Sequence, residues 1–303
     1  MDVVELHDRC VEEFLRLVRG VAADRWDGPT PCTDWTVREL VNHLVYEERW
    51  AVPLMAGGTI ESVGDRFDGD LLGDDPVAAA EHAARAAQAA AVEPVLAGRT
   101  VHLSFGDHPA EEYARQLAAD HLIHAWDLAV ATGQDSGLPA DLVDNVAGWF
   151  ADDREQGYRD GGWIADRPSS DHGDDPRARL LVRFGRDPRW SPALAAVEAF
   201  NAAFAAADVD AIMALMTEDC VFESTGPAPD GRRHEGAAAV REVWEELFAG
   251  TERPRFEWED VEAYGERGVV RWRFGWDGGH VRGVDVLTLR GGKIAEKLSY
   301  VKG

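Results

Sequence analysis

The chain has 303 residues, of which 45% are apolar, so it can bury one large core or two ordinary ones. Its formal net charge is −25, which repels nucleic-acid phosphates and anionic membrane surfaces, so we expect no nucleic-acid or membrane partner. The N-terminal residues lack the basic and apolar segments of a signal peptide, no apolar run approaches transmembrane length, and three cysteines are too few for a disulfide framework, which together predict a cytoplasmic protein.

Residues 1–188 show the apolar spacing of successive amphipathic helices. Thr36 is a candidate N-cap with Glu39 as its capping-box partner, and Gly133 is a natural C-cap for the long helix before it. The stretch T-V-H-L-S-F is compatible with a short strand or an extended connection. We predict an all-α helix bundle with helices at 4–21, 36–55, 77–95, 109–132 and 140–156.

The pattern changes after G-R-D-P-R-W-S-P, which has the composition of a linker. Downstream, V-V-R-W-R-F-G-W alternates aromatic and arginine side chains, as a half-buried strand does, and the pair G-G at 291–292 predicts a hairpin turn. Residues 193–303 are therefore expected to form an α+β domain with helices on a curved antiparallel sheet. The predicted helices and strands lie at 193–207, 209–217 and 236–249, and at 220–224, 255–264, 269–276, 280–289 and 293–300, respectively.

The stretch D-H-L-I-H-A-W-D-L-A places two histidines and two carboxylates on one predicted helix. At ~100° per residue, Asp120, His124 and Asp127 share a stripe on this helix, whereas His121 lies ~100° away from Asp120. Two ligands four residues apart can hold one cation between them.

A third metal ligand would have to come from another helix, and the second predicted helix offers His43, with Glu47 one turn later. Three protein ligands and one open position are typical of a catalytic divalent-metal site. The same spacing also arises by chance on exposed helices, where carboxylates and histidines make simple surface contacts. The residues alone therefore leave a metal site and a solvated polar stripe as alternatives.

Three stretches in order, T-P-C-T-D-W-T-V-R-E-L-V-N-H-L, H-A-W-D-L-A-V-A-T-G and G-R-D-P, resemble the actinobacterial maleylpyruvate isomerase-like family, a mycothiol-dependent, DinB-like group of metal-binding proteins. The resemblance covers about residues 5–190. It implies a four-helix bundle that holds a divalent metal, most often zinc, through His43, Asp120 and His124.

The carboxylate ligand of this family is often glutamate, and the shorter Asp120 could loosen the site or change its metal preference. His121 could substitute as a ligand, although its angular offset argues against this role. Asp127 is expected to orient a ligand or to cap a packing contact, and Glu47 is a further candidate for the surroundings of the metal.

The chemistry implied by the resemblance is based on a thiol. A metal-bound mycothiol would be a thiolate at neutral pH, because a cation lowers the pKa of a thiol that binds to it. Such a nucleophile can add to an unsaturated diacid and leave again, which isomerises it, or stay attached, which is an S-transfer. The sequence does not choose between these reactions.

Residues 193–303 resemble the SnoaL-like/NTF2-like cone, through A-A-D-V-D-A-I-M-A-L-M-T-E-D-C-V-F-E, G-A-A-A-V-R-E-V-W and R-G-V-D-V-L-T-L-R-G-G-K-I. This fold hosts isomerases, cyclases, hydrolases and many non-enzymes, so it does not define an activity by itself. Polar and aromatic residues are candidates for a pocket or its rim in the cone, namely Glu223, Trp276, His280, Arg282 and Asp285.

Ketosteroid isomerase shares this fold, and Asp285 falls at the position of its protonated oxyanion donor. Its general base falls at Ser224, with Glu223 one residue away, and its oxyanion tyrosine falls at Phe200. Two of the three roles are therefore missing, and we reject that chemistry. Asp285 is expected to be a buried pocket residue, or else to pair with Arg271 or Arg273 or face solvent.

Three functions are compatible with the sequence. The first is a metal-dependent, mycothiol-using isomerase or S-transferase, with the cone as a substrate or interaction module. The second is an enzyme whose chemistry lies in the cone and acts on a small hydrophobic or polyketide-like molecule. The third is a non-catalytic small-molecule-binding protein. A homodimer through the NTF2-like domain is also expected, because such domains often pair through their open sheet face.

Overall fold

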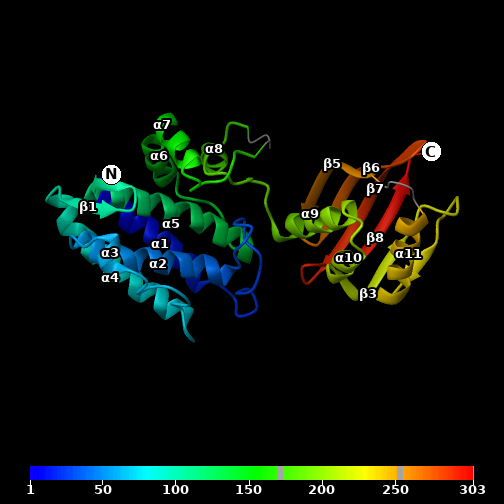
Figure 1. Cartoon of the computed structure of the whole chain (residues 1–303), viewed down its shortest axis with the longest axis horizontal. Helices are drawn as coiled ribbons and strands as arrows, with labels where there is room; N and C mark the ends of the chain where they lie inside the picture. Colours follow the sequence, from blue (N-terminus) through cyan, green and yellow to red (C-terminus); the bar gives the residue numbers. More distant parts are fainter. Residues whose placement is uncertain (169–172, 251–254, 303) are drawn as a thin grey trace. The chain divides into compact units, whose positions relative to one another are not determined.

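The computed structural model describes residues 1–168, 173–250 and 255–302 (Figure 1). The chain divides into two compact units, Met1–Trp190 and Ser191–Gly303. The boundary lies within the stretch whose composition predicts a linker.

The first unit is mostly helical, as predicted. Its long helices pack side by side in an all-α bundle, in which α1 contacts α4 and α5, and α2 contacts α4 and α5. The described helices of this unit are α1 (Val3–Arg19), α2 (Val37–Met55), α3 (Ile60–Val63), α4 (Pro76–Leu96), α5 (Ala110–Thr132), α6 (Ala140–Trp149), α7 (Asp152–Asp160) and α8 (Pro176–Arg183).

The two helices that carry the predicted metal ligands begin and end where the sequence signals indicate. At the start of α2, Thr36 and Glu39 form the predicted capping box, which satisfies two backbone donors that the helix leaves free. The end of α5 has Gly133 in the left-handed conformation with a φ of 74°, which a side chain would disfavour. These caps fix the bounds of both helices and hence the positions of their side chains.

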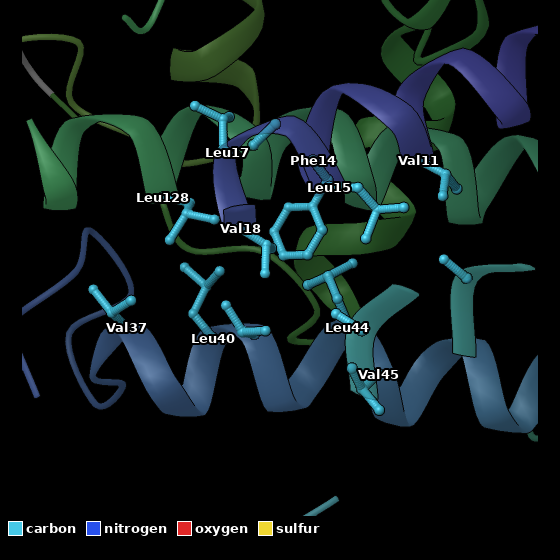
Figure 2. Packing of buried hydrophobic residues seen from close by; sticks show 14 of the residues in the cluster. Val11, Phe14, Leu15, Leu17, Val18, Val37, Leu40, Leu44, Val45 and Leu128 are labelled. Carbon is cyan, nitrogen blue, oxygen red and sulfur yellow. The ribbon is translucent and has the colours of Figure 1, made fainter. Parts of the chain in front are cut away.

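The core of the bundle is built from aliphatic and aromatic side chains that α1, α2, α4 and α5 contribute at helical spacing. Figure 2 shows Leu40 and Leu44 of α2 directed toward Phe14 and Val18 of α1. All four side chains are almost fully buried, and each such burial contributes about 1.5–3 kcal/mol relative to an exposed side chain. This packing holds α2 and α5 in fixed positions relative to each other.

One part of the first unit differs from the prediction, and in another part the structure decides between two predicted alternatives. The expected helix over 140–156 is two helices, because the chain turns at Phe150, whose buried ring stacks on Phe184 with centroids 4.0 Å apart. The stretch T-V-H-L-S-F forms one strand of a hairpin, in which β1 (Thr100–Leu103) pairs antiparallel with β2 (Gly106–Pro109). The break at Phe150 is accompanied by a contact with the distant Phe184, which local periodicity does not record.

The second unit is an α+β cone in which helices cover one face of a curved sheet. Its strand order is β4-β3-β8-β7-β6-β5, and all neighbouring pairs are antiparallel except β3 and β8, which are parallel and so differ from the predicted sheet. Its elements are α9 (Pro192–Ala205), α10 (Val209–Ala214), β3 (Met216–Glu223), β4 (Arg233–Glu235), α11 (Ala237–Gly250), β5 (Arg255–Tyr264), β6 (Arg267–Trp276), β7 (Gly279–Arg290) and β8 (Lys293–Val301).

The two faces of the sheet are chemically different, as the alternation along β6 predicts. Trp272 is directed into the core, which it shares with rings from α9, β3 and α11. Arg271 and Arg273 lie on the opposite face, where they pair with Asp260 and Glu257 of β5. In the part of the chain that the structure describes, no helix is both long and apolar enough to cross a membrane.

Candidate metal centre

Three side chains predicted as metal ligands converge between α2 and α5. His43 Nε2 lies 3.3 Å from one oxygen of Asp120, and His124 Nε2 lies 3.4 Å from the other oxygen. The potential ligand atoms of all three residues lie within 4.8 Å of one another. One carboxylate and two imidazoles in this arrangement are a donor set that suits zinc and related divalent cations.

The geometry follows from the helices that carry these residues. Asp120 and His124 are one turn apart on α5, so they share a face, and α2 places His43 beside them. Burial acts to raise the pKa of Asp120, but His124 and His43 outweigh it and hold that pKa well below its ordinary value. The centre therefore keeps a carboxylate negative charge at neutral pH, which favours a cation.

Asp127 orients His124 from the side away from the other two ligands. Its carboxylate lies 2.9 Å from His124 Nδ1, which donates to it, so Nε2 is the ring nitrogen that is directed toward Asp120 and could bind a metal. Asp127 is fully buried and is held in turn by Arg186, whose Nε and Nη2 donate to it at 2.9–3.1 Å. These contacts are the ones that the predicted orienting role of Asp127 requires, and the role itself stays a prediction.

Cys32 and Trp35 belong to the loop before α2 and complete the surroundings of the two histidines. The thiol of Cys32 lies 3.4 Å from the Asp127 carboxylate and accepts from Arg186 Nη2 at 3.2 Å. The Trp35 ring lies 4.6 Å from the His43 ring, centroid to centroid. Cys32, His124 and Asp127 form a second group whose potential ligand atoms lie within 4.8 Å of one another.

A cleft of about 670 Å³ lies over this centre. Its lining includes all three predicted ligands, Glu47 and Tyr113, together with residues of the loop at 31–35, the β1–β2 turn and the segments around α7 and Arg186. Such a volume is typical of small-molecule sites. The predicted ligands are therefore accessible to a small molecule.

Glu47 lies one turn after His43 and lines the same cleft, as its place in the sequence predicts. Burial raises the pKa of Glu47, and the negative charge of Asp120 raises it further. Within the described residues its carboxylate makes no hydrogen bond or ion pair, which leaves it available to the contents of the cleft.

His121 faces the interior of the bundle and is fully buried. Its Nε2 lies 2.9 Å from the buried carboxylate of Glu48, and its Nδ1 lies 2.8 Å from the Leu117 carbonyl oxygen. Both ring nitrogens are therefore occupied by groups other than the three predicted ligands. The expectation that His121 packs is met, and the alternative that it faces water is wrong.

The five candidate pocket residues of the cone are divided between the two faces of the sheet. Register places Asp285 and Trp276 on the core side and Glu223, His280 and Arg282 on the helix-free side, where Arg282 pairs with Glu259. Side chains on opposite faces of one sheet cannot line one pocket. The structure therefore does not bring this set together.

Asp285 is buried, and it pairs with Lys297 rather than with an arginine of β6 or with solvent. The Lys297 ammonium lies 2.6 Å from its carboxylate and donates to Ser299, which donates to Asp285 in turn. The rings of Phe204, Phe222 and Trp244 surround the same ammonium group at 5.3–5.9 Å. A carboxylate held against an ammonium differs from the protonated donor of ketosteroid isomerase.

Sequence reasoning missed Arg186, Cys32 and Lys297. Arg186 and Cys32 lie inside the G-R-D-P and T-P-C-T-D-W stretches that carry the family resemblance, which is the signal that could have found them. The buried residues of β8, Ile294 and Lys297, are three positions apart, because the register shifts between them, so a period of two could not predict the burial of Lys297 or its partner.

Comparisons with known proteins agree with both units. Residues 7–129 match the mycothiol maleylpyruvate isomerase N-terminal domain, and residues 197–297 match the SnoaL-like domain. Two uncharacterized proteins from two strains of Mycobacterium tuberculosis are each 35% identical to the chain over 143 residues, which are 47% of this chain and 74% of the relative.

Solved structures with a similar fold include an NTF2-like protein of unknown function from Mesorhizobium loti. It is 38% identical, with 39% of this chain and 96% of that chain covered and a TM-score of 0.35. An NTF2-like protein of unknown function from Burkholderia xenovorans is 20% identical, with coverage of 37% and 83% and a TM-score of 0.33.

The predicted fusion of two domains is thus confirmed, and the match of the first unit supports a small-molecule isomerase-type function and a metal-binding domain. The chain belongs to the family of the mycothiol maleylpyruvate isomerase N-terminal domain, here joined to a SnoaL-like domain.

Proposed function

We propose that the first unit is a metal-dependent enzyme that uses a thiol of the mycothiol type either to isomerise a small molecule or to add to it and stay attached through its sulfur. The observation that carries this proposal is the convergence of His43 Nε2, the Asp120 carboxylate and His124 Nε2 within 4.8 Å at a cleft. A polar stripe facing water would show neither the convergence from two helices nor the cleft.

The residues present fit a divalent cation, with zinc favoured by the two imidazole donors. His43, Asp120 and His124 would hold it, and a bound cation would lower the pKa of a thiol in the cleft toward neutrality. Asp127 fixes the tautomer of His124, and the bidentate bond from Arg186 fixes Asp127. These bonds hold one donor atom in place before any ligand arrives.

Elemental analysis of the purified full-length chain tests the metal assignment. We expect about one divalent metal per chain, and loss of that metal from His43→Ala and His124→Ala. Asp120→Glu restores the carboxylate common in the family and should retain metal, and His82→Ala, an exposed histidine on α4, is the matched control. Metal-free wild type, or full retention by the His43→Ala and His124→Ala double variant, would overturn the assignment.

A cobalt-substituted protein tests use of the thiol. Addition of mycothiol should produce a sulfur-to-cobalt charge-transfer band in the wild type, and no such band with the S-methylated thiol. Mass spectrometry of the reaction mixture then separates the two reactions, because isomerisation leaves the substrate mass unchanged and S-transfer adds the mass of the thiol. The absence of any band at millimolar mycothiol would remove the thiol from the proposal.

We further propose that the chain forms a homodimer through the helix-free face of the cone sheet. Val269, Val286 and Leu298 form a row across β6, β7 and β8 on this face, and Val284 and Tyr300 form the next row. Light scattering should give a dimer mass for the wild type and a monomer mass for Val286→Lys. A wild-type monomer at micromolar concentration contradicts this proposal without affecting the metal site.

A further inference from the structure

One part of the cleft lining is a group of four neighbouring aromatic rings, one from the β1–β2 turn and three from the segment between α6 and the loop after α7. Phe105 comes from the β1–β2 turn, Trp149 from the end of α6, Tyr158 from α7 and Trp163 from the loop after it. Ring centroids are 4.9 Å apart for Phe105 and Trp163, 5.1 Å for Trp163 and Tyr158, and 6.2 Å for Tyr158 and Trp149. These four residues form a continuous surface, which we call the aromatic wall.

The aromatic wall is fixed at one end and open at the other. Trp149 donates its indole N–H to Glu112 at 3.1 Å, and the Arg154 guanidinium lies 4.5 Å from the centre of its ring. By contrast, Phe105 is 43% exposed and Trp163 is 53% exposed. Large rings left exposed beside a cleft are a surface that a bound ligand would cover.

The charges of the cleft lining are mostly negative. Asp34, Glu47 and Asp120 contribute carboxylates. Among the described lining residues, Arg186 alone has a permanently positive side chain. Its guanidinium already donates to Asp127, to the Cys32 sulfur and to the Phe184 carbonyl oxygen. It therefore has little capacity left for an anionic ligand.

A dicarboxylate would fit this lining badly. One of its carboxylates could reach the metal centre, but the other would lie among aromatic rings and near Glu47. The two arginines that the described residues place there, Arg186 in the lining and Arg154 over Trp149, already donate to Asp127 and Glu112, respectively. A flat unsaturated ring without charge would instead stack on the aromatic wall, and its binding would not require the removal of water from a charged group. Charge and shape of the lining thus select against the diacid that the family resemblance implies.

We propose that the substrate of this cleft is a flat, aromatic or conjugated molecule without negative charge, and that the aromatic wall is its binding surface. The inference rests on the proposed function, since it names the substrate class of that same cleft. It requires no change in the metal ligands, none of which belongs to the aromatic wall.

A matched series of naphthalenes tests the selection by charge. Isothermal titration of the full-length, metal-loaded protein would compare 2-naphthamide, 2-naphthoate and naphthalene-2,6-dicarboxylate, which share one ring system and differ in charge. We expect the amide to bind at least tenfold more tightly than the dicarboxylate. Glu47→Gln should narrow this ratio severalfold, because it removes an unpaired carboxylate. Equal or tighter binding of the dicarboxylate would overturn the inference.

A second set of variants tests the binding surface. Phe105→Ala and Trp163→Ala remove exposed rings and are expected to weaken the amide at least fivefold each, while the folded state is retained. Trp258→Ala, which removes an exposed ring of the second unit, is the matched control and should leave binding unchanged. Unchanged binding to both wall variants would place the ligand elsewhere and overturn the inference.

The same samples separate the failure of this inference from the failure of the proposed function. Metal content is measured on each protein, and the titrations are repeated with the His43→Ala and His124→Ala double variant. If the wild type contains no metal and still binds the amide through the aromatic wall, the proposed substrate class is supported and the proposed metal-dependent activity is refuted. If the wild type contains one metal per chain but does not prefer the amide, the proposed metal-dependent activity stands and the proposed substrate class is refuted.

Discussion

Both units bury charged side chains, but they surround them differently. In the first unit, Arg186, Asp127 and His124 form a chain of hydrogen bonds that leads to the cleft. In the second unit, Lys297 and Asp285 pair with each other inside a shell of aromatic rings, and Ser299 closes the group. The arrangement in the first unit orients a nitrogen atom of His124 toward the cleft. In the second unit, the charged groups form their hydrogen bonds and ion pair with one another.

This contrast teaches that burial of charge does not by itself mark a functional site. A buried ion pair loses hydration on both members, and replacement by apolar residues is often neutral or stabilising, so its presence needs a reason. In the bundle the reason is the orientation of His124. In the cone, the described residues show the pair as part of the core. The following variants are chosen to break or sharpen the contrast.

The largest effect is expected for Lys297→Met in the cone. It leaves Asp285 buried beside apolar rings without its ammonium partner, which should destabilise the second unit by about 3–5 kcal/mol. Calorimetry of the full-length protein should show a lower transition for one unit while metal content stays at the wild-type value.

A double variant, Lys297→Met with Asp285→Leu, is the control for this effect. It removes both charges, so most of the lost stability should return. If the double variant is as unstable as the single one, the pair has a role in the fold that charge burial does not explain. If metal content falls in either variant, the stability of the second unit affects metal binding by the first.

The next effect is expected at the metal centre, for Asp127→Asn. Loss of the carboxylate weakens the bond that fixes the tautomer of His124, and removal of such an orienting partner costs about 10–100-fold in metal affinity. Competition with a chromophoric chelator measures that affinity. Asp141→Asn, at an exposed pair with Arg9, should not change it. Wild-type affinity in Asp127→Asn would show that the hydrogen bond does not tune the metal site.

A third, pH-dependent effect concerns His7, a buried side chain of α1 that belongs to neither arrangement. It is 1% exposed, and neither ring nitrogen has a hydrogen-bond partner within the described residues. Burial, together with the neighbouring His121, lowers its pKa to about 3. In the unfolded chain His7 takes up a proton below about pH 6.5, so stability falls as the pH drops from 6.5 toward 3.

The contribution of His7 amounts to about 2 kcal/mol of lost stability at pH 5 relative to pH 7.5. His7→Leu removes it, so the variant should gain stability over the wild type as the pH is lowered. Urea unfolding at pH 7.5 and pH 5 measures the two differences. A constant difference at both pH values would mean that His7 is protonated in the folded protein.

The smallest effect is expected for Arg282→Ala on the helix-free face of the cone. Its pair with Glu259 is exposed to solvent, where ion pairs contribute little and salt screens them. Thermal unfolding of this variant should coincide with that of the wild type, which provides the baseline for Lys297→Met. A clear loss of stability or of dimer mass would show that the proposed dimer interface extends beyond the two apolar rows to Arg282.

The sequence by itself determined the division into two domains, the type of most of the long elements and the shared face of Asp120 and His124. These features follow from local spacing, because a helix repeats every 3.6 residues and a strand every two. His43 was a candidate from the second predicted helix and was assigned by the family resemblance, since no local pattern links a residue on α2 with residues on α5. Its agreement with the structure shows how far a family resemblance extends local reasoning.

Only the tertiary structure decided which charged groups meet. Arg186 reaches Asp127 across 59 residues, and His121 reaches Glu48 across 73. Such partners are chosen by the packing of helices around a core, and many pairings of the same residue types are compatible with one sequence pattern. The same reason explains why the predicted cone pocket was divided between two faces, while the cleft of the first unit was not foreseen.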